Sequence, residues 1–533
     1  MTKSKILLGI LIAVVLLIAG LIGLETYLNN KLTNVLKNQI ELQLGYEYDI
    51  DFDELSVSLI QNELSINQLS FSKSRGSEQD WIFTAGKVEF EGFRGFSFLL
   101  GKGFGVDSIV LLEPNIDIKR FAFSDFKADT TATGEPKKKK QKTDSLKVSI
   151  GGINCRRGSL NYDPEGPEQF SCDFDFIIKE IEFEGKLKNI EKLWDDSGVL
   201  LTDAKYQFSD SVYTMTVESI DLTESDSDIS ITNFTLESNL SKSAFPKKFG
   251  WRKSRFAAHA PIVTVSRPKN FNDSLLVISN VNLDSLYLEI HKDNRYPWPD
   301  RVTKLPQGAI AAIKMPIRVD SINFTNSAFK FIGIFDSDIP SVIDIIEING
   351  SLAGLQNIDT VEADLFKFEA TSLFMGETRL GMQLTYKYGE NDPFELNAEV
   401  GETNLSFMSD FLQSVAGIRI DEGRVTKLDL HMTGNKYAER GYVDFYYTNL
   451  NITAVDKQTG EKKWLMNVLA DIASGVLFWK ENPNSNKFRR GDISKERTLY
   501  KGFAAQWIEG LFDGILNSVS KVDPSKVKLK KKK

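Results

Sequence analysis

The feature that most constrains this chain is an uncharged apolar run from Ile6 to Leu24, with the sequence ILLGILIAVVLLIAGLIGL. It is long enough to cross a bilayer as a helix, which takes about 20 apolar residues. A cleaved secretory signal is the alternative, because such signals also place basic residues before an apolar stretch. The run is longer than the apolar core of a usual signal, and no A-x-A-like cleavage site follows it. We therefore predict an uncleaved transmembrane anchor over residues 6–24, which includes Ile6, Leu11, Val15 and Leu21.

The charges beside the anchor predict its orientation. Lys3 and Lys5 lie on its short amino-terminal side, and basic residues favour the cytoplasmic side of a membrane. Residues 1–5 would then be a cytoplasmic tail. The bulk of the chain, residues 25–533, would lie across the membrane as an extracytoplasmic body held by a single span.

The composition is that of a folded protein and narrows the classes of partner. Apolar residues make up 41% and charged residues 26% of the 533 residues, so large-scale disorder is not expected. The net charge of −8 argues against nucleic acid as a partner. With 36 Phe residues, the chain is rich in a residue type that favours strands with a large apolar face.

The hydrophobic pattern changes after the anchor. Residues 25–45 have helical spacing of apolar side chains, and Gly45 ends this predicted linker helix. From residue 46 to residue 455, apolar and polar residues alternate in short runs, which predicts an extended β body. Within it, residues 127–144 contain no large apolar side chain and predict a flexible basic loop.

Four segments of the predicted β body have one form, a short strand, a small or polar break, and a second alternating strand. They are Gly105–Arg120, Val148–Tyr162, Ile278–Asp293 and Pro316–Phe331. Tandem units of this kind predict one sheet that grows by addition rather than a closed compact domain. Their irregular spacing argues against a propeller or a β-helix of fixed period.

Helical periodicity returns in residues 456–520. The clearer of two stripes runs from Tyr500 to Val519, with Gln506 placed on its polar face, and the basic tail of residues 521–533 follows. Such a helix either caps the sheet or lies on a membrane surface, where an apolar stripe and a lysine tail would act together. The residues predicted for this role are Phe503, Trp507, Leu511 and Phe512.

The chain has two cysteines, Cys155 and Cys172, which flank the turn signal NYDPEG. They could lie opposite each other on a hairpin and form a disulfide in an oxidising compartment. The alternative is a pair of free thiols buried in a sheet, and the sequence does not decide between the two.

No motif for catalysis is present. The three histidines have no metal-ligand spacing, and HExxH, CxxC and GxSxG are absent. Gly95 to Gly105 departs from a phosphate-binding loop and is interpreted as a glycine-punctuated turn. The segment Arg295–Asp300, RYPWPD, could stack on a sugar, but a loop that holds its Trp against the core is favoured. We expect no enzymatic activity, no metal and no cofactor.

The order of these segments resembles a known family. The anchor and linker helix are followed by EYDIDFDELSVSLIQNELSINQLSFSK and KVEFEGFRGFSFLLGKGFGVDSIVLLEPNIDIKR, and EGRVTKLDLHMTG lies near the end. This layout is similar to the AsmA-like superfamily of Gram-negative envelope proteins, the kin of TamB and YhdP. The final part, from FYYTNLNITAVD to WIEGLFDGI, resembles the ending of Bacteroidota members.

The resemblance implies a mainly β protein with an elongated, curved antiparallel β-sheet groove on an inner-membrane helix, and a body in the periplasm. Such a groove would shield phospholipid acyl chains, in lipid transport or outer-membrane and envelope homeostasis. Other envelope proteins are further expected partners. The alternative is a structural or assembly factor of the envelope, with a filled core and no lipid cargo.

Overall fold

The computed structural model describes residues 24–33, 48–59, 61–75, 78–100, 102–119, 148–179, 181, 197–223, 228–268, 275–313, 316–335, 340–358, 365–388, 391–457 and 478–521. Most of the predicted anchor, residues 34–45 of the linker helix, the basic loop, the first carboxy-terminal stripe and nearly all of the basic tail lie outside these residues. Residues 24–33 are helical, which agrees with the start of the linker helix. Within the described part of the chain, none of the helices has the length and apolar character that a bilayer span requires.

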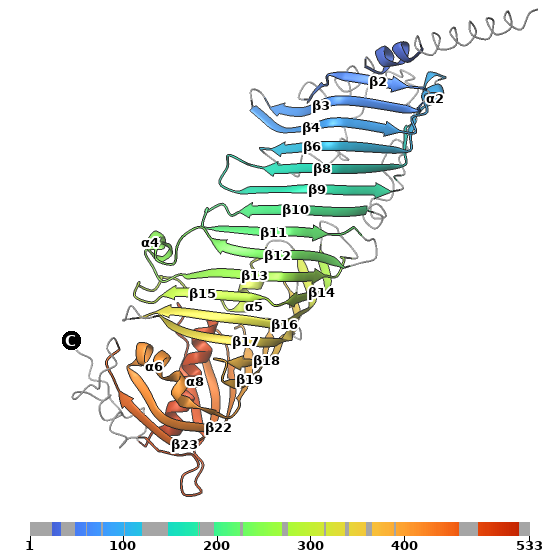
Figure 1. Cartoon of the computed structure of the whole chain (residues 1–533). Coiled ribbons are helices and arrows are strands. Elements are labelled where there is room, and N and C mark those ends of the chain that lie inside the picture. Colours follow the sequence, from blue (N-terminus) through green and yellow to red (C-terminus); the bar gives the residue numbers. More distant parts are fainter. Residues whose placement is uncertain are drawn as a thin grey trace, which may run out of the picture. The chain divides into compact units, whose positions relative to one another are not determined.

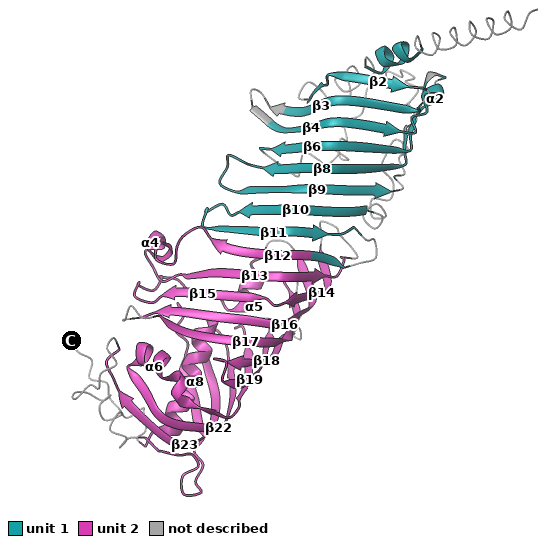
Figure 2. Ribbon diagram, viewed as in Figure 1, with its two compact units in different colours: residues 1–230 teal, residues 231–533 magenta. Residues whose placement is uncertain are grey.

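The protein is mainly β, as the alternation of residues predicted. Its strands form one large mixed sheet of 22 strands and a separate sheet of two (Figure 1). The prediction of an antiparallel sheet was wrong in part, because β6 pairs with β8 in parallel and β16 pairs in parallel with β14 and β15. The chain divides into two compact units, residues 1–230 and 231–533 (Figure 2).

Unit 1 is built from strands that pair largely in chain order. The sequence of pairing is β3–β4–β6–β8–β9–β10–β11, while β1 and β2 lie end to end along β3. The elements are β1 (Tyr48–Asp51), β2 (Glu54–Ser58), β3 (Glu63–Arg75), β4 (Glu78–Glu91), α2 (Gly95–Leu99), β5 (Phe104–Val106), β6 (Ser108–Ile118), β7 (Val148–Ile150), β8 (Gly152–Tyr162), β9 (Gln169–Lys179), β10 (Ser197–Gln207) and β11 (Tyr213–Asp221).

Unit 2 continues with long strands and ends in a helix. In it β14 and β15 lie end to end along β16, and antiparallel pairs then lead from β16 to β24. Its elements are β12 (Ile229–Ser238), α4 (Ala244–Phe249), β13 (Ser254–Val265), β14 (Leu276–Asp284), β15 (Tyr287–Asp293), α5 (Pro306–Ile310), β16 (Ile317–Ile334), β17 (Ser341–Gln356), β18 (Leu365–Phe374), β19 (Thr378–Lys387), β20 (Phe394–Val400), β21 (Thr403–Asn404), η2 (Leu405–Met408), α6 (Ser409–Ala416), β22 (Ile418–Gly434), β23 (Ala438–Ala454), β24 (Gly491–Glu496) and α8 (Phe503–Val519).

The breaks in the four repeated segments are residues with left-handed backbone. Glu113 and Arg157 have φ of 52° and 55° in the middle of β6 and β8, and Asn326 has φ of 47° in β16. In the fourth segment the break, Ser285 with φ of 57°, separates β14 from β15. The repeated segments therefore correspond to the parallel pairs, in which the breaks lie side by side. Arg157 forms an ion pair of 3.0 Å with Glu113, and the Ser285 amide donates to the Thr325 carbonyl at 2.9 Å.

Each break changes which side chains share a face of the sheet. In β8, Cys155 is paired with Phe176 and Gly158 with Phe174, so that Arg156 and Arg157 together lie opposite the single residue Asp175 of β9. This is a β-bulge, and it bends the strand and shifts the alternation by one residue. Because of that shift, Ile153 and Cys155 on one side of the break lie on the same face as Leu160 and Tyr162 on the other.

The described residues contain two apolar cores. The first, in unit 1, joins the helix of residues 24–33 to β2, β3 and β4, with Leu28, Leu55, Leu64 and Val88 buried in it. The second, in unit 2, joins β18–β23 to α8, with Tyr386, Met432 and Tyr447 almost fully buried.

Helix α8 lies unusually close to the sheet in unit 2. The residues that face the sheet recur every four positions and are small or polar: Gln506, Gly510, Gly514 and Ser518. A Cβ atom on Gly514 would lie 2.4 Å from Cγ2 of Val443, and one on Gly491 in β24 would lie 1.8 Å from the Gly514 carbonyl oxygen. Glycine is therefore required on both sides of this contact, since any side chain would push the helix away.

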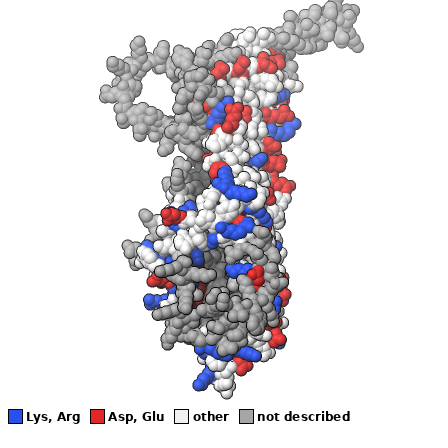
Figure 3. Space-filling model, turned by 90° about the vertical axis from the view of Figure 1, so that its left-hand side faces the viewer, with Lys and Arg blue, Asp and Glu red and all other residues white. Residues whose placement is uncertain are grey.

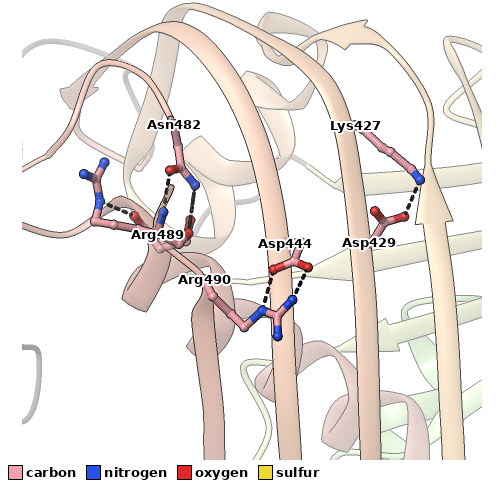
Figure 4. Close-up of polar contacts among 7 residues, drawn as sticks. Lys427, Asp429, Asp444, Asn482, Arg489 and Arg490 are labelled. Atoms are coloured by element: carbon pink, nitrogen blue, oxygen red, sulfur yellow. Dashed lines mark hydrogen bonds and ion pairs between the residues drawn. The ribbon is translucent and has the colours of Figure 1, made fainter. Parts of the chain in front are cut away.

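Buried Asn482 connects strand β23 to the segment that precedes β24. Its Nδ2 atom donates to the Phe445 carbonyl at 2.7 Å and to the Arg489 carbonyl at 2.9 Å, and its Oδ1 accepts from the Arg489 amide at 2.9 Å (Figure 4). Beside it, Arg490 makes a two-pronged ion pair with Asp444 at 2.8 and 2.7 Å. These contacts fix the segment before β24 against β23.

Substitution of Gly491 by alanine tests the close contact of α8. We expect Gly491→Ala to lower the free energy of unfolding by about 1–3 kcal/mol, the usual cost of overpacking. The measurement is urea unfolding of the full chain followed by tryptophan fluorescence. Gly381→Ala in β19 is the matched control, because a Cβ there has nothing within 4 Å. Equal stability of the two variants would contradict the described packing.

Candidate functional site

The candidate site is one face of the sheet in unit 1, here called the unit 1 apolar face. The strand register places apolar side chains directly opposite one another on successive strands, in two rows that cross β4, β6, β8, β9 and β10 and a third that ends at β9. The rows are Trp81–Ile118–Tyr162–Phe170–Tyr206, Phe83–Ile116–Leu160–Cys172 and Val88–Leu111–Cys155–Phe176–Val199. Residues directly opposite each other share a face, so each row is continuous.

The opposite face of the same strands carries polar contacts. Ser159 donates its hydroxyl to Asn115 at 2.7 Å, and the Asn161 amide donates to Asp117 at 2.8 Å, both across the β6–β8 pair. The carboxylate of Asp175 accepts from the Arg157 amide at 2.6 Å. Unit 1 therefore has a sheet with one apolar face and one mixed face, on which these polar contacts lie beside Val110 and Ile177.

The unit 1 apolar face is only partly covered by the described residues. Val88 and Cys155 are buried, whereas Phe170, Leu201 and Tyr206 are partly exposed. Over β8–β11 the described part of the chain contributes no helix to this face and no apolar core of the kind found at β2–β4. Contiguous exposed apolar surface on a folded protein is usually a binding surface.

The two cysteines are free and buried, so the disulfide alternative does not describe this structure. They are on adjacent strands but not opposite each other, since Cys155 pairs with Phe176 and Cys172 with Leu160. Burial raises the pKa of the Cys155 thiol to about 12 and that of the Cys172 thiol to about 11. Both act as small apolar side chains of the unit 1 apolar face.

The predicted residues of the last helix separate into two rows. Trp507 and Leu511 pack against the core of unit 2, whereas Phe503 and Phe512 are 40% and 39% exposed. Ile508 and Leu516 extend the exposed row at four-residue spacing. Gln506, which the pattern placed on the polar outer face, is instead buried against the sheet and donates to Glu439 at 2.9 Å. The helix packs on the sheet, and a membrane role for its outer row stays a prediction.

The described residues offer no arrangement for metal chemistry. They contain no group of three His, Cys, Asp or Glu side chains that could hold a metal ion. His291 is buried and His259 is exposed, while His431 contacts Asn397 at 2.6 Å. The glycine-rich segment from Gly95 forms the short helix α2 and leads into β5.

Sequence reasoning missed the surroundings of Trp298. Its ring lies 4.3 Å from the Arg252 guanidinium and 4.5 Å from the Lys292 ammonium, measured to the ring centroid. The three residues are 46 positions apart at most, but no spacing rule connects them. Only the aromatic segment Arg295–Asp300 could be recognised from the sequence.

The chain matches no family model, no curated protein and no solved structure. The resemblance to AsmA-like proteins therefore stays a prediction.

The state of the cysteines can be tested by alkylation. At pH 8 and without reductant, we expect iodoacetamide to leave both thiols of the folded chain unmodified, because raised pKa values and burial keep them protonated and covered. After unfolding in urea, still without reductant, mass spectrometry should find two labelled cysteines. An unlabelled unfolded chain would mean that the two form a disulfide.

Proposed function

We propose that this protein is a membrane-anchored envelope protein whose unit 1 apolar face binds lipid acyl chains, in lipid transport or envelope homeostasis. The observation that carries the proposal is the set of three apolar rows, in which Phe170 of β9 and Tyr206 of β10 are partly exposed. The bulge at Arg157 against β9 supports a curved, groove-like face, since a bulge bends its strand.

The dimensions of the rows suit an acyl chain. Neighbouring strands are about 4.8 Å apart, so a row across five strands extends for about 19 Å. One leaflet of a hydrocarbon core of about 30 Å is about 15 Å deep, which is the length that one acyl chain fills. Each buried CH₂ contributes about 0.8 kcal/mol, so many weak contacts can hold a chain without a dominant residue.

The location follows from the predicted anchor at residues 6–24. A single span in the inner membrane with the body in the periplasm would place the unit 1 apolar face between two membranes. The helix of residues 24–33, packed by Leu28 and Leu32 on the first strands, supports a short connection between anchor and sheet. The partners proposed are the inner membrane, phospholipid and other envelope proteins.

The scaffold alternative has support in unit 2. There the apolar face of β18–β24 is covered by α8, and Leu396, Leu430 and Val443 are at most 6% exposed. This part of the sheet has a filled core and no room for a ligand chain. The alternative for the whole protein is an envelope assembly factor that uses its sheet as a scaffold.

Position-specific photocrosslinking in cells tests lipid binding. With a benzophenone amino acid at Leu160 we expect covalent phospholipid adducts, detected by mass spectrometry of the purified chain. The same amino acid at Gln207, which alternates with Tyr206 and points to the mixed face, is the control and should give none. Protein adducts alone at both positions would support the scaffold.

A charge on the unit 1 apolar face, at Leu201 beside Phe174, should weaken lipid retention, whereas a truncation should not. We expect Leu201→Glu to lower co-purifying phospholipid at least about tenfold, since this needs a loss of only about 1.4 kcal/mol. Leu160→Ala should change it less than about twofold, because the binding is distributed. Gln207→Glu is the charge-matched control. If Leu201→Glu retains as much lipid as Gln207→Glu, the face does not bind lipid.

The predicted topology can be tested separately. A reporter that is active only in the cytoplasm, fused after Lys533, should be silent because Lys3 and Lys5 favour retention of the amino terminus inside. The same reporter fused before Met1 should be active. High activity of the carboxy-terminal fusion would overturn the orientation.

A further inference from the structure

Three cationic side chains surround the ring of Trp298 in unit 2. The Arg252 guanidinium and the ammonium groups of Lys292 and Lys501 lie 4.3, 4.5 and 5.7 Å from its centroid. They come from separate parts of the fold, namely the segment after α4, strand β15 and the turn before α8. Tyr500 also belongs to this cluster, because the centroid of its ring lies 5.2 Å from that of Trp298.

The carboxylates of Glu509 and Asp293 near this cluster are both paired. Glu509 pairs with Lys501, and Asp293 pairs with Arg295 at 2.8 Å. Among the described residues no carboxylate forms an ion pair with Lys292, although the charges of Arg252 and Lys501 both act on its ammonium. The Arg252 guanidinium donates to the carbonyls of Asn294 and Tyr296, which orient it.

The effect of placing these cations together appears in the pKa of Lys292. Burial and the charges of Arg252 and Lys501 lower its pKa to about 8. Contact with an aromatic face stabilises a cation, but only by about 0.5–2 kcal/mol. A group that is costly to charge and yet held beside two cations is typical of a site that receives an anion.

We propose that Arg252, Lys292 and Lys501 around Trp298 form a binding site for a phosphate group, carried by a soluble phosphate ester or by an anionic lipid headgroup. Arginine matches phosphate with a fork of donors, and lysine adds a compact charge. Figure 3 shows that Lys and Arg side chains lie among Asp and Glu side chains on its face.

The phosphate site does not depend on the acyl-chain proposal, because all contacts of the phosphate site lie within unit 2, whereas the acyl-chain proposal concerns unit 1. A phosphate would interact with Arg252 and Lys292 directly, and Lys501 would contribute while it remains paired with Glu509. The two proposals can therefore fail separately.

Isothermal titration of the full chain in a neutral detergent tests the site. Inorganic phosphate is compared with chloride at equal ionic strength, and dihexanoyl phosphatidylglycerol with dihexanoyl phosphatidylcholine, which has the same tails and no net charge. We expect at least one of the two anionic probes to bind and Lys292→Gln to weaken it at least about tenfold, since a hydrogen bond to a charged group contributes about 1.5–3 kcal/mol. Binding of phosphate points to a soluble ester, and binding of the glycerol lipid alone points to a headgroup.

The charge-matched control is Lys367→Gln with Lys387→Gln, two exposed lysines of β18 and β19. It should leave the affinity within about twofold of that of the unaltered chain. Arg252→Gln should weaken anion binding as much as Lys292→Gln does. If Arg252→Gln unfolds the protein because its carbonyl contacts are lost, the result for Lys292→Gln is used alone. Failure of both anionic probes to bind, or an equal loss of affinity in the lysine control, would overturn the proposal.

Discussion

The left-handed residues in the middle of the long strands determine which side chains share a face of the sheet. A non-glycine residue in this conformation costs about 1–2 kcal/mol, yet Gln68, Glu113, Arg157, Asp203 and Asn326 all adopt it. Without the shift at Arg157, the apolar residues of β8 would divide between two faces, because side chains alternate in an unbroken strand. The cost of the break is offset by the continuity of the apolar rows with β9, which has no such residue.

In both units the strand register aligns apolar side chains in rows, but the rows are covered to different extents. In unit 2 the row Leu384–Leu396–Met432 is covered by α8, whose glycines allow it to approach the sheet. In unit 1 the equivalent rows keep partly exposed side chains over β8–β10. The helix with small residues every four positions fills the core of unit 2, and among the described residues no such helix lies on the rows of unit 1.

The local features of this structure could be predicted from the sequence, and the long-range ones could not. Alternation predicted a β body over residues 46–455, and the four repeats with a small or polar break correspond to the strands with left-handed residues. Parallel pairing of β6 with β8 was missed because it depends on a long connection and leaves no local pattern. Gln506 was placed outside because a polar residue on an apolar helix is usually exposed, whereas here Glu439 provides a buried partner. The cations around Trp298 come from three separate segments, and proximity of that kind is set by the fold alone.

The pairing of strands in chain order has a consequence for how the protein is made. From β3 to β11 each strand of the large sheet pairs with the strand of that sheet that precedes it in the chain. The early strands can therefore pair while later ones are still being synthesised. Insertion of one further hairpin would lengthen the row by two strand spacings and leave the existing pairs unchanged. The length of the sheet is thus a variable that evolution can adjust in steps of about 10 Å.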